Sequence, residues 1–427
     1  MQPTTFHARS VSVLTVVLLV AALAAHAQDD AASKFPNWTK VDSSEQRRVY
    51  VDAMREANPA AFAGEVRTFA VDTVLPQLQL EANRGTIEVV RRKLRSLLLD
   101  NVGDAKAFEA ASRAVLEFMR PLARDDKAEP LVRLNAMLLI GELRSRDNKA
   151  LPWPGSIEEL TSAAGDGKLP AYVRIAALAG LAQHVEAAQK KGSATAAGLG
   201  KTLGPVLVPI VSAPPAGDRA ATDWLASRAL DMLPVVMPEL SAQAAAAAEQ
   251  VLADASRSID VRVRAAVALG AAARPASGIK ASQAVTAIRS LVTGALEADL
   301  RAAEKNSGGP SIVPGAAGPN PPGGTAPGAE SGHHIPDAVG RRAAWRLAVL
   351  ARAIGAEQGK GGLIELLPDN EKVAARDLAT DLMLASQQLD LSPSEQAMRD
   401  LLAQIQNPGS AAPAADAPAA EADPFGK

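Results

Sequence analysis

Apolar residues recur every three or four positions along most of this chain, which is the spacing of one face of an α-helix. In the stretch from Thr86 to Leu99, aliphatic side chains share one face, and Arg91, Arg92 and Arg95 occupy the other. We expect this basic face to be exposed to solvent. Similar stretches follow one another, separated by loops rich in proline and glycine, so the pattern predicts an all-α protein. Further helices are predicted at 43–57, 60–80, 105–124, 129–144, 156–164, 199–211, 242–255, 281–304, 372–388 and 392–406.

Local signals indicate where some of these helices begin and end. Three of them begin with a serine that is followed three residues later by Glu or Gln. In this capping-box spacing, the serine hydroxyl accepts a hydrogen bond from a backbone amide of the first turn. Within the helix predicted at 60–80, Pro76 lacks an amide donor, so we expect it to kink or shorten that helix. The predicted capping pairs are Ser43 with Gln46, Ser156 with Glu159, and Ser392 with Glu395.

One helical pattern occurs more than once. Its best copy is the stretch from Ser258 to Arg274, where a Val-Arg pair is followed by alanine one turn later and by leucine two turns later. Good copies also lie at 129–144 and 169–183, and weaker ones at 224–234 and 339–348. The first two good copies are 41 residues apart, and the second and third are 88 apart, which leaves room for two units. The repeated residues are Val132, Arg133 and Ala136; Val173, Arg174 and Ala177; and Val261, Arg262, Ala265 and Leu269.

A unit of about 40 residues, with two helices of which the second opens on Val-Arg, resembles the HEAT-repeat family. The resemblance covers roughly Ala105 to Gly355 and implies an α-solenoid of stacked antiparallel helix pairs, which we extend by helical pattern to 43–406. In this family the aspartate before the valine and the arginine after it often connect neighbouring units. Asp260 and Arg262 are therefore expected to be inter-repeat ties, whereas the other two good copies carry only the arginine. The small alanines are expected where helix axes approach closely.

The N-terminus has the pattern of a secretory signal peptide. His7 and Arg9 precede an apolar run that ends in Ala25-His26-Ala27, so we expect cleavage after Ala27 and export to the periplasm or the cell exterior. An uncleaved membrane anchor is the alternative, but the run is shorter than the roughly 20 residues that a spanning helix needs. No later apolar stretch of the sequence is long enough to span a bilayer.

Composition narrows the classes of function. The sequence has no cysteine, which excludes thiol chemistry and disulfides. Removal of residues 1–27 takes away one arginine and leaves 44 basic residues (45 − 1) against 47 acidic ones, a net charge of −3. This balance argues against nucleic acid or anionic lipid as a partner. Three segments lack helical periodicity and are predicted to be flexible or disordered: a lead-in at 28–42, an insertion at 306–336 in which 15 of 31 residues are Gly or Pro, and a tail at 407–427.

Short motifs typical of active sites lack the context that their chemistry requires. Gly200-Lys201-Thr202 matches the end of a phosphate-binding loop, but Thr195 stands where its first glycine belongs, and no buried strand precedes it. Ser277 and Lys280 have the SxxK spacing of penicillin-recognising enzymes, but no SDN or KTG motif accompanies them. Both stretches are better explained as loops or helix starts.

The histidines give no stronger signal. His333 and His334 are adjacent within the insertion, where they have no metal-binding helical spacing. His184 is expected near the end of a helix, where a cation interacts favourably with the helix dipole. We therefore predict no catalytic, cofactor-binding or metal-binding residues.

The sequence thus favours a non-enzymatic, exported scaffold that presents an extended helical surface to a protein or peptide partner. Trp224 and Trp345 are candidate contacts, because large rings are rare in this chain, although burial in the core is the favoured explanation for each. Two alternatives remain open: a structural protein of the cell envelope without a dedicated ligand, and an enzyme with an unrecognised site. The oligomeric state does not follow from the sequence.

Overall fold

A computed structural model describes residues 41, 44–148, 151–215, 217–237, 241–275, 277–307, 337–355 and 361–406. The chain divides into two compact units, Met1–Gly155 and Ser156–Lys427, which are described separately below. The predicted signal peptide (1–27) and tail (407–427) lie outside the described residues. So does the predicted lead-in (28–42) apart from Val41, which is buried, and the predicted insertion (306–336) apart from its first two residues, which are helical.

Within the described ranges every regular element is a helix, and the only other pairing is an isolated bridge between Arg144 and Pro152. The prediction of an all-α protein is therefore confirmed. The first unit is built around α5, α6 and α7, which contact one another and the turns of η3 and η4. Its elements are α3 (Glu45–Arg55), α4 (Gly64–Thr68), η3 (Phe69–Val74), η4 (Leu75–Gln79), η5 (Glu81–Thr86), α5 (Ile87–Leu99), α6 (Ala105–Arg124) and α7 (Pro130–Glu142).

The prediction of one helix at 60–80 is wrong in part. Residues 60–63 are not helical, and the rest consists of a short α-helix, π turns from Phe69 to Val74 and a 3-10 turn that contains Pro76. Proline has no amide to donate to the carbonyl four residues earlier, so the regular α-helical hydrogen bonding cannot continue through this point. The change from π to 3-10 turns beside Pro76 fits this loss.

The basic face of α5 is not simply solvated, which corrects a second prediction. Arg91 is largely buried and its guanidinium binds Glu142 of α7, with Nε 3.2 Å from Oε2 and Nη2 3.1 Å from Oε1. A further bond joins Arg91 to the side chain of Asn135. Of the three arginines, only Arg92 is exposed. Arg91 therefore holds α5 against α7 inside the unit.

Two predicted capping serines are displaced by one or two residues. Ser44 caps α3, because its Oγ accepts from the amide of Arg47 at 3.1 Å, and Ser43 lies outside the described residues. Ser394, rather than Ser392, caps the last helix by accepting from the amide of Ala397 at 3.1 Å. Sequence spacing located these helix starts only approximately, because serines lie close together at both places.

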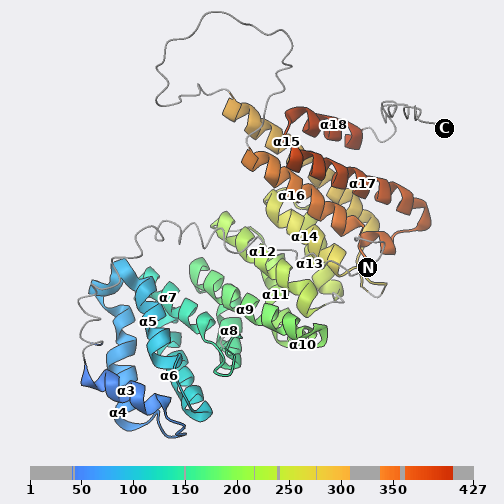
Figure 1. Cartoon of the computed structure of the whole chain (residues 1–427). Coiled ribbons are helices and arrows are strands. Elements are labelled where there is room, and N and C mark those ends of the chain that lie inside the picture. The colour runs from blue at the N-terminus through green and yellow to red at the C-terminus, as the bar shows by residue number, and fades with distance from the viewer. Residues whose placement is uncertain are drawn as a thin grey trace, which may run out of the picture. The chain divides into compact units, whose positions relative to one another are not determined.

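The second unit consists of two sets of helices (Figure 1). Members of the first set, α8, α11, α13, α15 and α18, contact one another in that order, and so do α9, α12, α14, α16 and α17 of the second set. Helices of the two sets also pair along the chain: α8 contacts α9, α11 contacts α12, α13 contacts α14, and α15 contacts α16. The helices are α8 (Ile157–Gly165), α9 (Ala171–Lys191), α10 (Ser193–Gly198), α11 (Gly200–Ser212), α12 (Arg219–Val236), α13 (Ala242–Ala253), α14 (Ile259–Ala271), α15 (Ala281–Ser307), α16 (Asp337–Ile354), η8 (Leu363–Leu366), α17 (Asp369–Leu391) and α18 (Glu395–Gln406).

The last pair of the second unit is reversed. α17 follows α16 in the second set, and α18 returns to contact α15 of the first set. In every earlier pair the first-set helix comes first in the sequence. α17 is therefore the last helix of its set in the described chain.

The repeated small residues are buried between helices. Ala136, Ala177 and Ala265 are fully buried. At Gly270 of α14, an added Cβ would lie 2.5 Å from the Cα of Ala353 in α16, so the two helices touch through their backbones there. The alanines and this glycine allow the close packing that large side chains would prevent.

Candidate functional site

The three repeated arginines make the same hydrogen bond. Each Nε donates to the carbonyl of the residue ten positions earlier, at the end of the preceding helix. The carbonyls at a helix C-terminus have no partner within the helix, so a cationic donor satisfies one of them and interacts favourably with the helix dipole. The bonds are Arg133 to Ala123 at 3.3 Å, Arg174 to Ala164 at 3.1 Å and Arg262 to Leu252 at 2.9 Å.

This bond corrects the role expected for Arg262. Its side chain joins α14 to α13, which belong to the same helix pair, rather than to the neighbouring pair. Asp260, in contrast, accepts from Arg346 of α16 at 3.0 and 2.9 Å and so connects two pairs. Burial lowers the pKa of Arg174 and Arg262, but a guanidinium stays charged throughout the accessible pH range.

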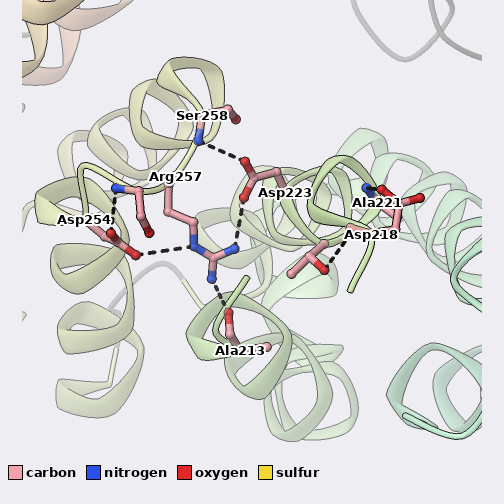
Figure 2. Close-up of polar contacts among 9 residues, drawn as sticks. Ala213, Asp218, Ala221, Asp223, Asp254, Arg257 and Ser258 are labelled. Atoms are coloured by element: carbon pink, nitrogen blue, oxygen red, sulfur yellow. Dashed lines mark hydrogen bonds and ion pairs between the residues drawn. The ribbon is translucent and has the colours of Figure 1, made fainter. Parts of the chain in front are cut away.

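In α12 the arginine position of the repeat is occupied by Ala226, and another residue performs the capping (Figure 2). Arg257, in the loop before α14, donates to the carbonyl of Ala213 at the end of α11. The same guanidinium donates to Oδ1 of Asp223 at 3.0 Å, and the second oxygen of Asp223 accepts from the amide of Ser258 at 2.9 Å. Both charged side chains are buried. This cluster ties the α11–α12 pair to the α13–α14 pair.

A second ionic cluster joins three helices further along, with Arg346 and Asp299 buried and Asp260 exposed. Arg346 of α16 binds both oxygens of Asp299 in α15, at 2.8 and 3.1 Å, in addition to Asp260 of α14. Burial raises the pKa of Asp299, and the attraction of Arg346 opposes this rise without cancelling it. One arginine thus faces two carboxylates in this cluster.

A strip of aromatic and charged side chains crosses three helices of the second set at their surface. In α12, Arg228 lies 5.2 Å from the ring centre of Trp224 and donates to Asp231 at 3.1 Å. Arg264 of α14 donates to the other oxygen of Asp231 at 2.6 Å. We call the set of Trp224, Arg228, Asp231, Arg264 and Trp345 the Trp–Arg strip.

The Trp–Arg strip continues onto α16. Arg264 lies 5.6 Å from the ring centre of Trp345, so each arginine is held between a tryptophan face and the shared carboxylate of Asp231. Trp345 is 40% exposed, and Trp224 is partly exposed. Burial raises the pKa of Asp231 and lowers that of Arg228, while the ion pairs act in the opposite direction on both groups.

The two tryptophans that the sequence singled out therefore lie on one continuous surface, and neither is a core residue. The three charged residues between them were missed. Trp224, Arg228 and Asp231 are four and three residues apart, which places them on one helix face and is visible in the sequence. Their connection to Arg264 and Trp345 depends on packing between helices, for which the sequence has no local signal.

The arrangement is suited to recognition. The ion pairs with Asp231 fix the orientation of both guanidinium groups, and the partly exposed tryptophan rings offer apolar contact area at the surface. The strip contains no nucleophile beside a base. Within the described ranges, no three His, Cys, Asp or Glu side chains are grouped so as to hold a metal ion.

A serine–histidine pair occurs elsewhere, but it is buried. Ser156 Oγ lies 3.0 Å from Nε2 of His184. Ser156 occupies the N-cap position of α8 as predicted, but its side chain makes no capping hydrogen bond there. The position expected for His184 is corrected, because His184 is buried within α9 rather than placed at its end. The distance suits a nucleophile and its base, but Ser156 has no accessible surface that a substrate can reach.

The structure places the other candidate motifs in ordinary helix starts and loops where it describes them. Gly200-Lys201-Thr202 forms the first turn of α11 and follows the short helix α10 instead of a strand. Ser277 lies in the loop before α15, where its hydroxyl donates to Arg274 at 2.6 Å. His333 and His334 lie outside the described residues.

A cavity of about 570 Å³ beside α17 has a largely apolar lining that includes Ile364, Met383 and Leu384.

Comparisons with known proteins give no further assignment: no family model, no curated protein and no solved structure matches the chain. Among the described helices, none has the length and apolar character required to cross a membrane. The fold and the surface therefore define the chain as an all-helical protein with a Trp–Arg strip on three neighbouring helices.

Proposed function

We propose that the chain is a non-enzymatic, exported scaffold whose helices form a HEAT-like α-solenoid and whose Trp–Arg strip holds a protein or peptide partner. The solenoid assignment is supported by the two sets of helices in contact order and by the arginine that recurs with the same bond in three pairs. Export is supported by the signal-peptide pattern before Ala27. N-terminal sequencing of the mature protein tests it, and a start at Gln28 is expected.

The observation that carries the binding role is the continuity of the strip. Tryptophan and arginine are among the residue types most enriched at the energetic centres of protein interfaces. Here two of each are aligned across α12, α14 and α16 and held by one shared carboxylate. Because these side chains are fixed before binding, little conformational entropy is lost when a partner docks.

Site-specific photo-crosslinking tests this role in the exporting cell. A photoreactive phenylalanine analogue at Trp345 is expected to give a discrete adduct, which is lost when Arg264 is also replaced by alanine. The matched control is the same analogue at Leu131 of α7, which is 47% exposed and lies in the other unit. Equal adducts at both positions, or none at Trp345, would contradict the proposal.

A structural role in the cell envelope is the second candidate. It predicts that the photoreactive analogue at Trp345 gives no discrete adduct and that Trp345→Ala leaves the distribution of the protein among cell fractions unchanged. The crosslinking result therefore separates the two candidates.

A further inference from the structure

A hollow of about 240 Å³ lies between α3 and α5 in the first unit, and its lining is basic. The charged lining residues are Arg47 and Arg55 of α3 and Lys93 of α5, and no aspartate or glutamate is among the described residues that line it. A cleft whose charges all have one sign concentrates ions of the opposite sign. We call this space the basic hollow, and its charge points to an anion as its ligand.

Buried side chains fix the inner part of the basic hollow. Tyr50 and Met54 of α3 line it and are 1% and 2% exposed. The Tyr50 hydroxyl donates to the carbonyl of Leu98 in α5 at 2.9 Å, which holds the two helices together beside the hollow. Apolar walls of low polarisability strengthen the field of the cations that share them with the ligand.

The loop that follows α5 supplies another part of the lining and is held against α3. Asn101 and Val102 of this loop line the basic hollow. The amide of Gly103 donates to the carbonyl of Met54 at 2.7 Å. A Cβ added at Gly103 would lie 2.9 Å from the carbonyl carbon of Arg55, so the loop backbone rests directly on the end of α3. These backbone contacts set the shape of the hollow before a ligand enters it.

We propose that the basic hollow binds the phosphate group of a small phosphomonoester. This group carries a charge of about −1.5 to −2 near neutral pH and has three terminal oxygens that accept hydrogen bonds. A carboxylate carries a single charge on two oxygens. Besides the three cations, the hydroxyl of Ser96 and the amide of Asn101 line the hollow as donors. The charge and the supply of donors therefore match a phosphate dianion better than a carboxylate.

Size limits the rest of the ligand. Pockets for drug-sized ligands have volumes of about 300–1,000 Å³, so a hollow of about 240 Å³ is too small to enclose a nucleotide. Val51, Leu97 and Val102 also line it, and they suit a small apolar or aromatic group beside the phosphate. The basic hollow belongs to the first unit and the Trp–Arg strip to the second, so this inference does not depend on the proposed scaffold function.

Calorimetric titration of the chain from Gln28 onwards with phenyl phosphate at low ionic strength tests the site. We expect one binding site with a dissociation constant of about 0.1–1 mM, the range for a ligand of roughly ten heavy atoms. Arg55→Gln and Lys93→Gln each remove one cation from the hollow and should weaken binding about fivefold or more. Added salt should weaken the binding of the wild type as well.

Arg92→Gln provides the matched control. Arg92 is the neighbour of Lys93 in α5, but it is exposed and does not line the basic hollow. Its loss changes the net charge equally and should leave binding unchanged, and circular dichroism checks that each variant is folded. Equal weakening by Arg92→Gln and Lys93→Gln would mean that only the general charge of the helix attracts the ligand. That result, or a wild type that does not bind phenyl phosphate, would overturn the proposal.

Two further probes define the ligand. Phenyl sulfate has the same shape but only one negative charge, so it should bind several-fold more weakly, and equal affinity would contradict the phosphomonoester assignment. Phosphatidic acid presents a phosphomonoester on a lipid, and sedimentation with phosphatidylcholine vesicles that contain or lack it distinguishes this source from a soluble ester. We expect the soluble ester, because the net charge of −3 after removal of residues 1–27 gives no attraction to an anionic surface. Sedimentation that requires both phosphatidic acid and Lys93 would instead assign the same group to a lipid.

Discussion

Replacing Gly270 by alanine is expected to force apart two helices that touch through their backbones. The new Cβ would lie 2.5 Å from both the Cα and the carbonyl oxygen of Ala353 and 2.9 Å from its carbonyl carbon. Carbon atoms in good contact are about 3.5–4.0 Å apart. Because the obstructing atoms belong to the backbone of α16, no side-chain rotation can relieve the contact, and the helices must separate by about 1 Å.

The magnitude follows from two opposing terms. Overpacking of a tight site costs about 1–3 kcal/mol, and a backbone obstruction belongs at the upper end of that range. Alanine in place of glycine favours the helix by at most about 1 kcal/mol. The net loss in the free energy of unfolding is therefore about 2 kcal/mol, which corresponds to a fall in Tm of about 4–8 °C.

Gly294 of α15 provides the matched control. It is also a helical glycine, but an added Cβ meets no atom within 4 Å. Gly294→Ala should therefore stabilise the protein by about 0.5–1 kcal/mol. Urea denaturation followed by circular dichroism measures both variants. If Gly270→Ala is as stable as the wild type, or if the two variants shift in the same direction, the close approach of α14 and α16 is not as described.

Three further predictions concern packing and buried charge. Ala265→Phe, at a fully buried position of the repeated pattern, should lower the free energy of unfolding by about 1–3 kcal/mol. Arg92→Ala, at an exposed position, should change it by less than about 0.5 kcal/mol. Similar thermal melts of the two variants would contradict the assignment of buried and exposed helix faces. Arg257→Met leaves Asp223 buried without its cation and should cost about 3–5 kcal/mol in urea denaturation, and the additional change Asp223→Leu should recover much of that loss; additive losses would argue against a direct ion pair. The pKa of Asp299 is raised, so its carboxyl binds a proton more tightly in the folded state than in the unfolded chain. The free energy of unfolding therefore rises as the pH falls through the folded-state pKa towards the unfolded value of about 3.9. Wild type should therefore gain stability relative to Asp299→Asn in denaturation series from about pH 7 to about pH 4, and a constant difference would show that burial does not raise this pKa.

Helical periodicity predicted most of the elements because it reflects which face each helix buries. α6 was placed at Ala105–Arg124 with the observed bounds, since its apolar stripe is uninterrupted and Asp104 accepts hydrogen bonds from the amides at its start. The prediction failed at 60–80, where Pro76 and the turns before it break the pattern. It also misjudged Arg91, because an arginine on the polar face of one helix can be buried by the next helix.

The candidate site was predicted only through its two tryptophans. Their rarity marked them, and nothing in the sequence linked Trp224 on α12 to Trp345 on α16. The link consists of Arg228, Asp231 and Arg264, whose pairing depends on the register between α12 and α14. Ion pairs between helices of different repeats have no fixed sequence spacing, so single-sequence patterns cannot locate them.

The weak copy of the repeat at 224–234 has a physical explanation in the capping of helix ends. The first helix of a pair ends with carbonyls that need donors, and an arginine after the repeated valine of the second helix supplies one in three pairs, α6–α7, α8–α9 and α13–α14. In the α11–α12 pair that position is Ala226, and Arg257 from the next loop reaches the carbonyl of Ala213 instead. The same arginine then needs an anion because it is buried, and Asp223 of α12 provides it. The loss of one motif arginine is thus compensated by an ion pair that also joins two helix pairs, so the sequence pattern degenerates while the packing it serves is kept.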